Sequence, residues 1–270
     1  MTIIDITPRL NIHPKSGSQL LTLVMRSIRK TRRDPQLLMY STMMPFAMLV
    51  LFSQVFRSIQ DGPAFPVGVA YIDYLAPAML AVSTVMGATN SGVAIATDLS
   101  SGVVDRFHAM PVPRWTVLAA RAITDELLTV IRVLLLGVGA YAILGFRFHG
   151  SAIEAIAAIA VLLPLSFAMS WVFILVGAKL RAPDLVQMAG MMVMMPFMFI
   201  SSAFAPLNTM PSWLRIVARI NPVTHTADAV RGYVLGAPDG AAALKAVATS
   251  AVLATLAIIG AFRVMRRPMN

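Results

Sequence analysis

The chain has 270 residues, of which 58% are hydrophobic and 13% are charged, and its net charge is +10. A soluble domain has about a quarter of its residues charged, so this composition indicates an integral membrane protein. The chain has no cysteine, which excludes disulfides and thiolate metal sites. Its basic residues flank the apolar stretches, so membrane topology explains the net charge and no nucleic-acid partner is predicted.

The N-terminal residues 1–35 are polar and basic and lack the uninterrupted apolar core of a signal peptide, so we expect them to remain in the mature protein. Their apolar residues recur at the spacing of one helix face, namely at Leu20, Leu21, Val24, Met25 and Ile28. This pattern predicts an amphipathic helix that lies at the inner membrane interface. Attraction of its bases to anionic lipid explains the segment equally well.

Six apolar stretches follow. Crossing a hydrocarbon core of roughly 30 Å takes about 20 helical residues, and the stretches that meet this length are residues 36–56, 74–97, 123–146, 155–178, 185–205 and 241–262. The predicted fold class is therefore an all-α integral membrane protein with six transmembrane helices. The membrane domain takes residues 36–262, between the segment 1–35 and a short tail, 263–270.

The positive-inside rule orients these spans. With a cytoplasmic N-terminus, the inner segments hold fifteen Lys and Arg residues and the outer segments hold six. Both termini are therefore predicted to be cytoplasmic. The connection 98–114 lies inside and the connection 206–240 lies outside.

The second span carries two stripes of small residues at four-residue intervals: Ser83, Gly87 and Ser91, and Ala88, Gly92 and Ala96. In lipid, small residues let helix backbones approach closely, so tight helix packing is the predicted role. Asn90 in the same span would face a polar cavity or form an interhelical hydrogen bond, and the sequence does not separate these two.

The third span contains Asp125, Glu126 and Arg132. Ionisable groups inside a membrane are costly and often functional, and an intramembrane hydrolase or a proton-coupled transporter would use such carboxylates. However, they lie in the cytoplasmic third, and Arg121 and Asp125 form an i, i+4 pair. We therefore favour a structural role.

The fifth span is rich in methionine. Met188, Met191, Met195 and Met198 are predicted to share one face, followed by Phe199, and Pro196 is expected to kink the helix. Methionine is frequent on adaptable apolar binding surfaces. For any single residue, helix packing or lipid contact is the simpler explanation, but the stripe as a whole predicts a substrate wall.

The segment after the fifth span is too polar to cross a membrane. Pro211 can start a helix there, Trp213, Leu214, Val217 and Ile220 give that helix an apolar face, and Asn221 with Pro222 breaks it. A second helix is expected to end at Gly232. We predict two short helices at the outer interface.

No signature of nucleotide or metal binding is present. The sequence has no Gly-Lys dipeptide and hence no phosphate-binding loop, and its four histidines, His13, His108, His149 and His225, are isolated. This chain is therefore not predicted to bind ATP or a metal ion.

Three segments together resemble the membrane permease subunits of type-2 ABC exporters, especially the daunorubicin-resistance-like drug and lipid exporters. They are the basic segment that leads into the first span, the loop "TDLSSGVVDRFHAMPVPRW", and the outer stretch "AFAPLNTMPSWLRIVARINPVTHTADAVRG". In the loop an acid, a Gly, an Arg and a Pro-rich step follow the order of the family pattern. The acid is Asp98, where the family usually has Glu.

The resemblance implies an exporter subunit that is not itself an enzyme. Its expected partners are two cytoplasmic ATPase subunits, which bind ATP and Mg, a second permease that is identical or homologous, and the lipid of a bacterial plasma (inner) membrane. The residues expected to couple to the ATPase are Asp98, Gly102, Asp105, Arg106, Pro111, Pro113 and Arg114. The expected substrate path includes Ser83, Gly87, Asn90 and the methionine stripe, and the outer-loop residues are Pro206, Pro211, Trp213, Asn221, Pro222, Asp228 and Arg231. The alternatives are an intramembrane lipid-modifying enzyme that uses Asp125 and Glu126, and a secondary transporter.

Overall fold

The computed structural model describes residues 25, 35–63, 65–101 and 114–266, and for 35–38, 40, 114–121, 265 and 266 it gives the helical backbone alone. Every regular element in these residues is a helix. In chain order they are α2 (Pro35–Val55), η1 (Arg57–Asp61), α3 (Tyr71–Ser100), α5 (Arg114–Leu144), α6 (Ala152–Leu180), α7 (Pro183–Phe199), η2 (Leu207–Thr209), α8 (Ser212–Ile220), α9 (Pro222–Val234) and α10 (Gly240–Arg266). The predicted interfacial helix of residues 1–35 falls outside this part of the chain, except for Met25 and Pro35.

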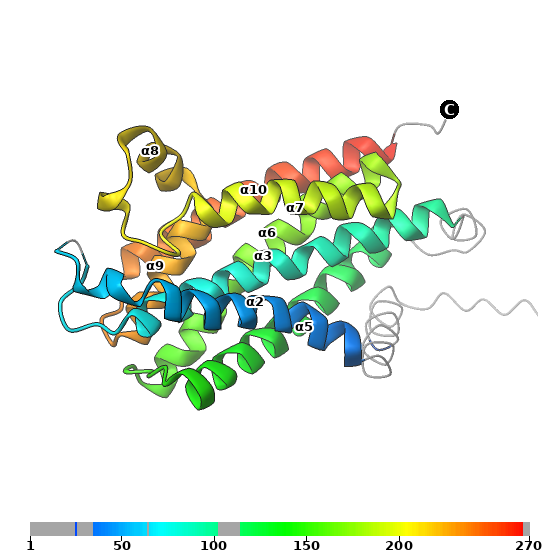
Figure 1. Cartoon of the computed structure of the whole chain (residues 1–270). Coiled ribbons are helices and arrows are strands. Elements are labelled where there is room, and N and C mark those ends of the chain that lie inside the picture. Colours follow the sequence, from blue (N-terminus) through cyan, green and yellow to red (C-terminus); the bar gives the residue numbers. More distant parts are fainter. Residues whose placement is uncertain (1–24, 26–34, 64, 102–113, 267–270) are drawn as a thin grey trace, which may run out of the picture.

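The six long helices lie side by side, and α8 and α9 gather at one end of the bundle (Figure 1). The two central helices are α3, which contacts α2, α5, α6, α7 and α9, and α6, which contacts α3, α5, α7, α9 and α10. The fully buried side chains Leu75, Met79, Leu162 and Leu165 come from these two helices. The apolar core therefore lies along the α3–α6 contact.

Each of the six predicted stretches corresponds to one long helix. Four helical segments are long and apolar enough to cross a membrane, namely Tyr71–Ser100, Ala122–Leu144, Ala152–Leu180 and Gly240–Val264, whereas Ser41–Val55 and Pro183–Phe199 are shorter apolar segments. The described part of the chain is therefore all-helical, with the long apolar helices of a membrane protein. The count of six spans and the side on which the termini lie stay predictions.

The fifth stretch ends sooner than predicted, because α7 stops at Phe199 and the chain is irregular as far as Pro206. Side chains take up the carbonyl groups that the helix end leaves free. The Ser201 hydroxyl donates to the Met198 carbonyl at 2.6 Å, and the Asn221 amide donates to the Ile200 carbonyl at 2.6 Å. These bonds replace the next helical turn.

The two short helices predicted between the fifth and sixth stretches are confirmed as helices, and their place at the outer interface stays a prediction. Pro211 is the residue that precedes α8, and Asn221 precedes α9 and caps it by accepting the Val223 N–H at 2.9 Å. The second helix continues past Gly232 to Val234. Glycine in the last turn of a helix is tolerated when neighbouring contacts hold the backbone, and here the Gly232 carbonyl accepts from Ala237 at 2.9 Å.

Candidate functional site

The predicted coupling region is described only at its two ends. Asp98 is partly buried in the last turn of α3, where the Ser101 hydroxyl donates to the Thr97 carbonyl at 2.7 Å. Arg114 is the first residue of α5. The remaining candidates, Gly102, Asp105, Arg106, Pro111 and Pro113, lie outside the described residues. Their role in coupling stays a prediction.

Arg132 on α5 is buried inside the bundle, with 5% of its surface exposed. Its Nη2 donates to the Thr129 hydroxyl at 2.8 Å, and Thr129 shares a 2.9 Å hydrogen bond with Ser166 of α6. The guanidinium occupies the space beside Gly87 of α3, since a Cβ at that position would lie 1.5 Å from Nη1. Gly87, predicted on the substrate path, therefore makes room for a buried cation within this chain.

The adjacent acids Asp125 and Glu126 have different surroundings. Asp125 is buried and accepts a hydrogen bond from the Ser91 hydroxyl of α3. Glu126, one position further, lines a groove with residues of α6 and α10, and neither of its carboxylate oxygens has a hydrogen-bond partner. Successive helix residues point about 100° apart, so the two acids face different neighbours. The hydrogen bond to Ser91 gives Asp125 a role in holding α5 against α3, whereas no such bond holds the Glu126 carboxylate.

The small residues of α3 pack closely against α6, as predicted. A Cβ at Gly92 would lie 2.4 Å from the Phe173 carbonyl oxygen, and a Cβ at Gly177 would lie 2.3 Å from the Gly92 carbonyl oxygen. The two backbones are thus in direct contact, which only residues without a side chain allow.

The other candidates on α3 have varied surroundings. Ser83 is buried and donates to the Leu80 carbonyl of its own helix at 2.7 Å, whereas Asn90 is partly exposed. Ser83 and Gly87 thus lie in the interior of the single chain, and Asn90 lies nearer its surface.

The methionines of α7 form an exposed apolar face. Met188, Met191 and Met195 are 62%, 60% and 56% exposed, and Phe199 is 48% exposed. Met192, which is not part of the predicted stripe, is 76% exposed and adds to this face. Met198 is an exception. It is 7% exposed and packs in the apolar core, although, seven residues after Met191, it lies only about 20° around the helix from that exposed residue.

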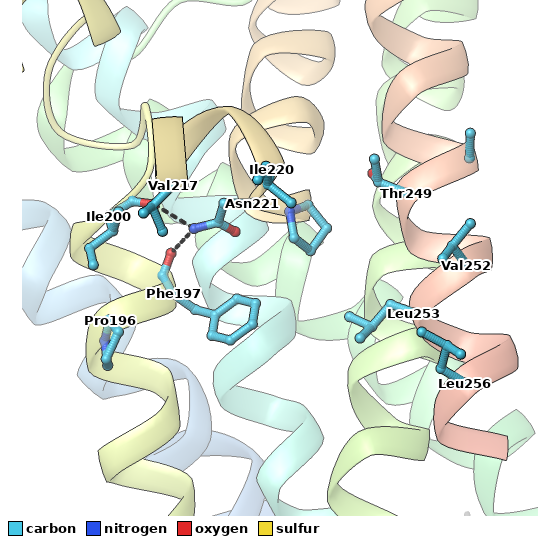
Figure 2. Close-up of a pocket in the computed structure, with 12 residues that line it drawn as sticks. Pro196, Phe197, Ile200, Val217, Ile220, Asn221, Thr249, Val252, Leu253 and Leu256 are labelled. Atoms are coloured by element: carbon cyan, nitrogen blue, oxygen red, sulfur yellow. Dashed lines mark hydrogen bonds between the residues drawn. The ribbon is translucent and has the colours of Figure 1, made fainter. Parts of the chain in front are cut away.

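An apolar groove of about 600 Å³ separates the C-terminal part of α7 from α10 beneath α8 (Figure 2). Phe197 of α7 faces Val252, Leu253 and Leu256 of α10 across it, and Ile200, just past the end of α7, also lines it. The Asn221 amide points at the carbonyls of Phe197 and Ile200, with distances of 2.7 Å and 2.6 Å. Asn221 therefore joins the end of α7 to the start of α9.

Arg231 of α9 lies at the centre of a second polar network. Its Nε donates to the Tyr74 carbonyl at 3.2 Å, its Nη2 to the Ser202 carbonyl at 3.1 Å, and its Nη1 to Asp228 Oδ1 at 2.6 Å. The guanidinium carbon also lies 3.6 Å from the centre of the Tyr74 ring. A planar cation with five donors suits this set of partners, which joins α3, α9 and the irregular segment after α7.

Ser202 completes this network. Its hydroxyl donates to Asp228 Oδ1 at 2.7 Å, and its carbonyl also accepts from the Tyr74 hydroxyl at 3.2 Å. The predicted outer-loop residues Asp228 and Arg231 are thus brought together, and Tyr74 and Ser202, which are not among the predicted site residues, join them. In the sequence Tyr74 is only the start of an apolar stretch, and no local pattern connects it with a residue 157 positions away.

The remaining outer-loop candidates lie apart from this network. Pro206 precedes η2, and Pro222 is the first residue of α9. Trp213, on α8, is 68% exposed. No group of three or more His, Cys, Asp or Glu residues that could hold a metal ion occurs within the described part of the chain.

The sequence matches the ABC-2 type transporter family over residues 18–235. The chain belongs to this family. The match spans the described helices from α2 to α9, which include the Arg132 cluster, the exposed face of α7 and the Arg231 network. The resemblance seen in the sequence is thereby confirmed.

Named relatives of this ABC-2 permease are drug-resistance and transport permeases. It is 30% identical to the daunorubicin resistance ABC transporter permease protein DrrB1 of Streptomyces coeruleorubidus over 218 residues, which cover 79% of this chain and 74% of the relative. It is 24% identical to the probable doxorubicin resistance ABC transporter permease protein DrrC of Mycobacterium tuberculosis, covering 82% and 78%. A putative transport permease, ycf38, of Porphyra purpurea is 24% identical, covering 79% and 72%. The ABC-2 permease is accordingly a multi-pass membrane protein of a transport family.

Proposed function

We propose that this ABC-2 permease moves a hydrophobic or amphipathic molecule out across a bacterial plasma membrane, powered by a separate ATPase. The observation that carries the proposal is the exposed, methionine-rich face of α7 in a chain of this family. Four side chains there, Met188, Met191, Met192 and Met195, are each more than half exposed. Flexible thioether side chains adapt to varied apolar molecules, which suits an export path.

The proposed topology has six spans with both termini in the cytoplasm. The 21 residues of α2 correspond to a length of about 31 Å, enough for a hydrocarbon core. The 17 residues of α7 correspond to about 25 Å, and the irregular segment that follows it continues toward the outer helices. The excess of Lys and Arg in the predicted inner segments supports this orientation.

A second permease, identical or homologous, would lie across from the exposed α7 face, so that substrate passes between the two. α2 also presents exposed side chains, with Met39, Met43 and Met44 at 68%, 59% and 56%. Such apolar faces contact lipid or another protein, and an export path between two permeases would use one of them. Each permease would bind one of two ATPase subunits, which hold ATP and Mg.

The loop at residues 98–114 would transmit the motion of the ATPase. Asp98 and Arg114 lie at the ends of α3 and α5, so a force on the loop would act directly on two helices of the bundle. Asp105 and Arg106 would hold the loop by charge pairs, and Pro111 and Pro113 would stiffen its return to α5.

The test is ATP-driven uptake of a fluorescent amphipathic dye into inverted vesicles that contain the permease and its co-purified ATPase. Replacing Asp105 and Arg106 by Asn and Gln should lower uptake about tenfold or more, while ATP hydrolysis and membrane insertion persist. Lys179→Gln is the matched control, because it removes an exposed base in the last turn of α6, away from this loop in the sequence. Unchanged uptake in the double variant would contradict the coupling role. Lipid conversion by the purified chain without ATP would favour the enzymatic alternative.

A further inference from the structure

A groove of about 580 Å³ lies between α5, α6 and α10, separate from the groove beneath α8. Its walls are largely apolar and include Leu163 and Phe167 of α6 and Val247 of α10. Val247, Ala251 and Thr255 are exposed, so the groove opens on the surface of the bundle. A molecule dissolved in the membrane could enter it from the side.

Two polar groups in this groove lack partners. Both carboxylate oxygens of Glu126 are covered and have no hydrogen bond, and the same is true of the hydroxyl oxygen of Ser250, whose residue is fully buried. The Ser166 hydroxyl is near enough to act on Glu126, but its hydrogen bond of good geometry is with Thr129 at 2.9 Å. A carboxylate has about four acceptor sites, so one hydroxyl would still leave it unsatisfied.

Arg132 forms no hydrogen bond with Glu126, although its charge attracts both the Asp125 and the Glu126 carboxylates. Its guanidinium donates to Thr129 and to the Leu128 carbonyl and lies beside Gly87. One cation does not offset the cost of two buried carboxylates, so a second cation would be stabilised beside Glu126. A neutral apolar molecule would leave this cost in place, whereas an ammonium group would remove it.

The groove lies deep along the bundle. Ser250 is 10 residues into α10, about 15 Å from its first residue and about 24 Å from its last. A bilayer lipid would have to draw its headgroup down from the interface to reach Ser250. A single-chain or other small amine reaches this depth more easily than a two-chain lipid.

We propose that this groove binds the primary ammonium group of a membrane-dissolved amphipathic molecule, with the Glu126 carboxylate as its counter-charge and the Ser250 hydroxyl as a further acceptor. The three donors of a primary ammonium match these acceptors, whose oxygens are covered in the absence of a ligand, so the Glu126 and Ser250 side chains would turn toward the groove on binding. The apolar walls receive the body of the molecule. The assignment of this molecule as cargo rests on the proposed function, but its binding does not.

The probe is dodecylamine, titrated into nanodiscs of phosphatidylcholine that contain the full chain without the ATPase. We expect a saturable component above simple partitioning into lipid. Glu126→Gln should weaken it about tenfold or more, and Ser250→Ala about two- to threefold. Asp184→Asn, which removes an exposed acid outside the groove, should leave it unchanged. Dodecanol, which lacks the charge, and dodecyltrimethylammonium, which lacks the N–H donors, should compete poorly with dodecylamine.

Equal binding to Glu126→Gln and wild type, or equal competition by dodecanol, would overturn the proposal. A thermal unfolding curve for each variant excludes misfolding, and Glu126→Gln should not lower Tm, since it removes a buried charge that has no hydrogen-bond partner. Glu126→Asp keeps the charge and should retain part of the binding.

Two further measurements separate the sources of the amine. Competition by phosphatidylethanolamine in the nanodisc, dependent on Glu126, would identify a lipid headgroup as the occupant, and its absence would identify a smaller amine. If the wild-type protein exports the dye but does not bind dodecylamine, the groove assignment alone is overturned. If the wild-type protein binds dodecylamine but exports no dye when its ATPase is present, the transport proposal alone is overturned.

Discussion

Arg132 occupies the volume that a side chain at position 87 would need, with its Nη1 placed 1.5 Å from where a Cβ of residue 87 would lie. The cation is 5% exposed and bonded to Thr129, which is itself bonded to Ser166. Gly87 is therefore part of the packing of α3, α5 and α6.

Gly87→Ala should displace the guanidinium from its bonds. Overpacking of this kind costs about 1–3 kcal/mol, so we expect a lower Tm for the detergent-solubilised chain. Gly137→Ala on α5 is the matched control, because no atom lies within 4 Å of a Cβ there. It should keep or slightly raise Tm. Equal Tm values for the two variants would show that Arg132 is not held against α3.

The contact between Gly92 and Gly177 should tolerate even less. A Cβ on either residue meets a backbone carbonyl at 2.4 Å or 2.3 Å, and a backbone cannot rotate away as a side chain can. We expect either alanine variant to lose about 3 kcal/mol or more. Because one separation of α3 from α6 relieves both overlaps, the double variant should lose less than the sum of the two. Additive losses, measured by thermal unfolding, would mean that the sites are independent.

Replacing Arg231 by Gln should loosen the end of the bundle at which α8 and α9 lie. The change removes the Arg231 donors from the Ser202 and Tyr74 carbonyls, although the Ser202 carbonyl keeps the Tyr74 hydroxyl, and we expect a loss of about 1–3 kcal/mol. Asp228 is 40% exposed, so the ion pair itself contributes little of this. Arg231→Lys keeps the charge but not the planar fork and should be nearly as harmful. The exposed Arg219→Gln is the control, and it should unfold like the wild type.

Asn221→Ala should free the end of α7 from the start of α9. The amide donates to two carbonyls and its oxygen caps α9, so we expect a loss of about 1–2 kcal/mol. Hydrogen exchange should rise first in residues 197–201 and 222–225. Asn208→Ala, at an exposed position, serves as the control. Unchanged exchange in both segments would show that Asn221 does not join the two helices.

The sequence alone determined the positions of the helices and the family. Apolar stretches of about 20 residues must form helices in lipid, because each backbone group needs a partner within its own segment. The break between α8 and α9 at Asn221 and Pro222 is likewise determined locally, because Asn favours a helix cap and Pro favours the first position of a helix. The charges and prolines of residues 98–114 were equally evident in the sequence, although the structure describes only the ends of that loop.

Only the tertiary structure decided which way the side chains point. Met198 lies in the core while Met195 is exposed, and Asp125 accepts a hydrogen bond from Ser91 while Glu126 lines a groove without a hydrogen-bond partner. Tyr74 and Arg231, 157 positions apart, form one network. These outcomes depend on which helices are neighbours. A hydrophobic pattern cannot specify this in a membrane protein, because lipid-facing and buried surfaces are both apolar.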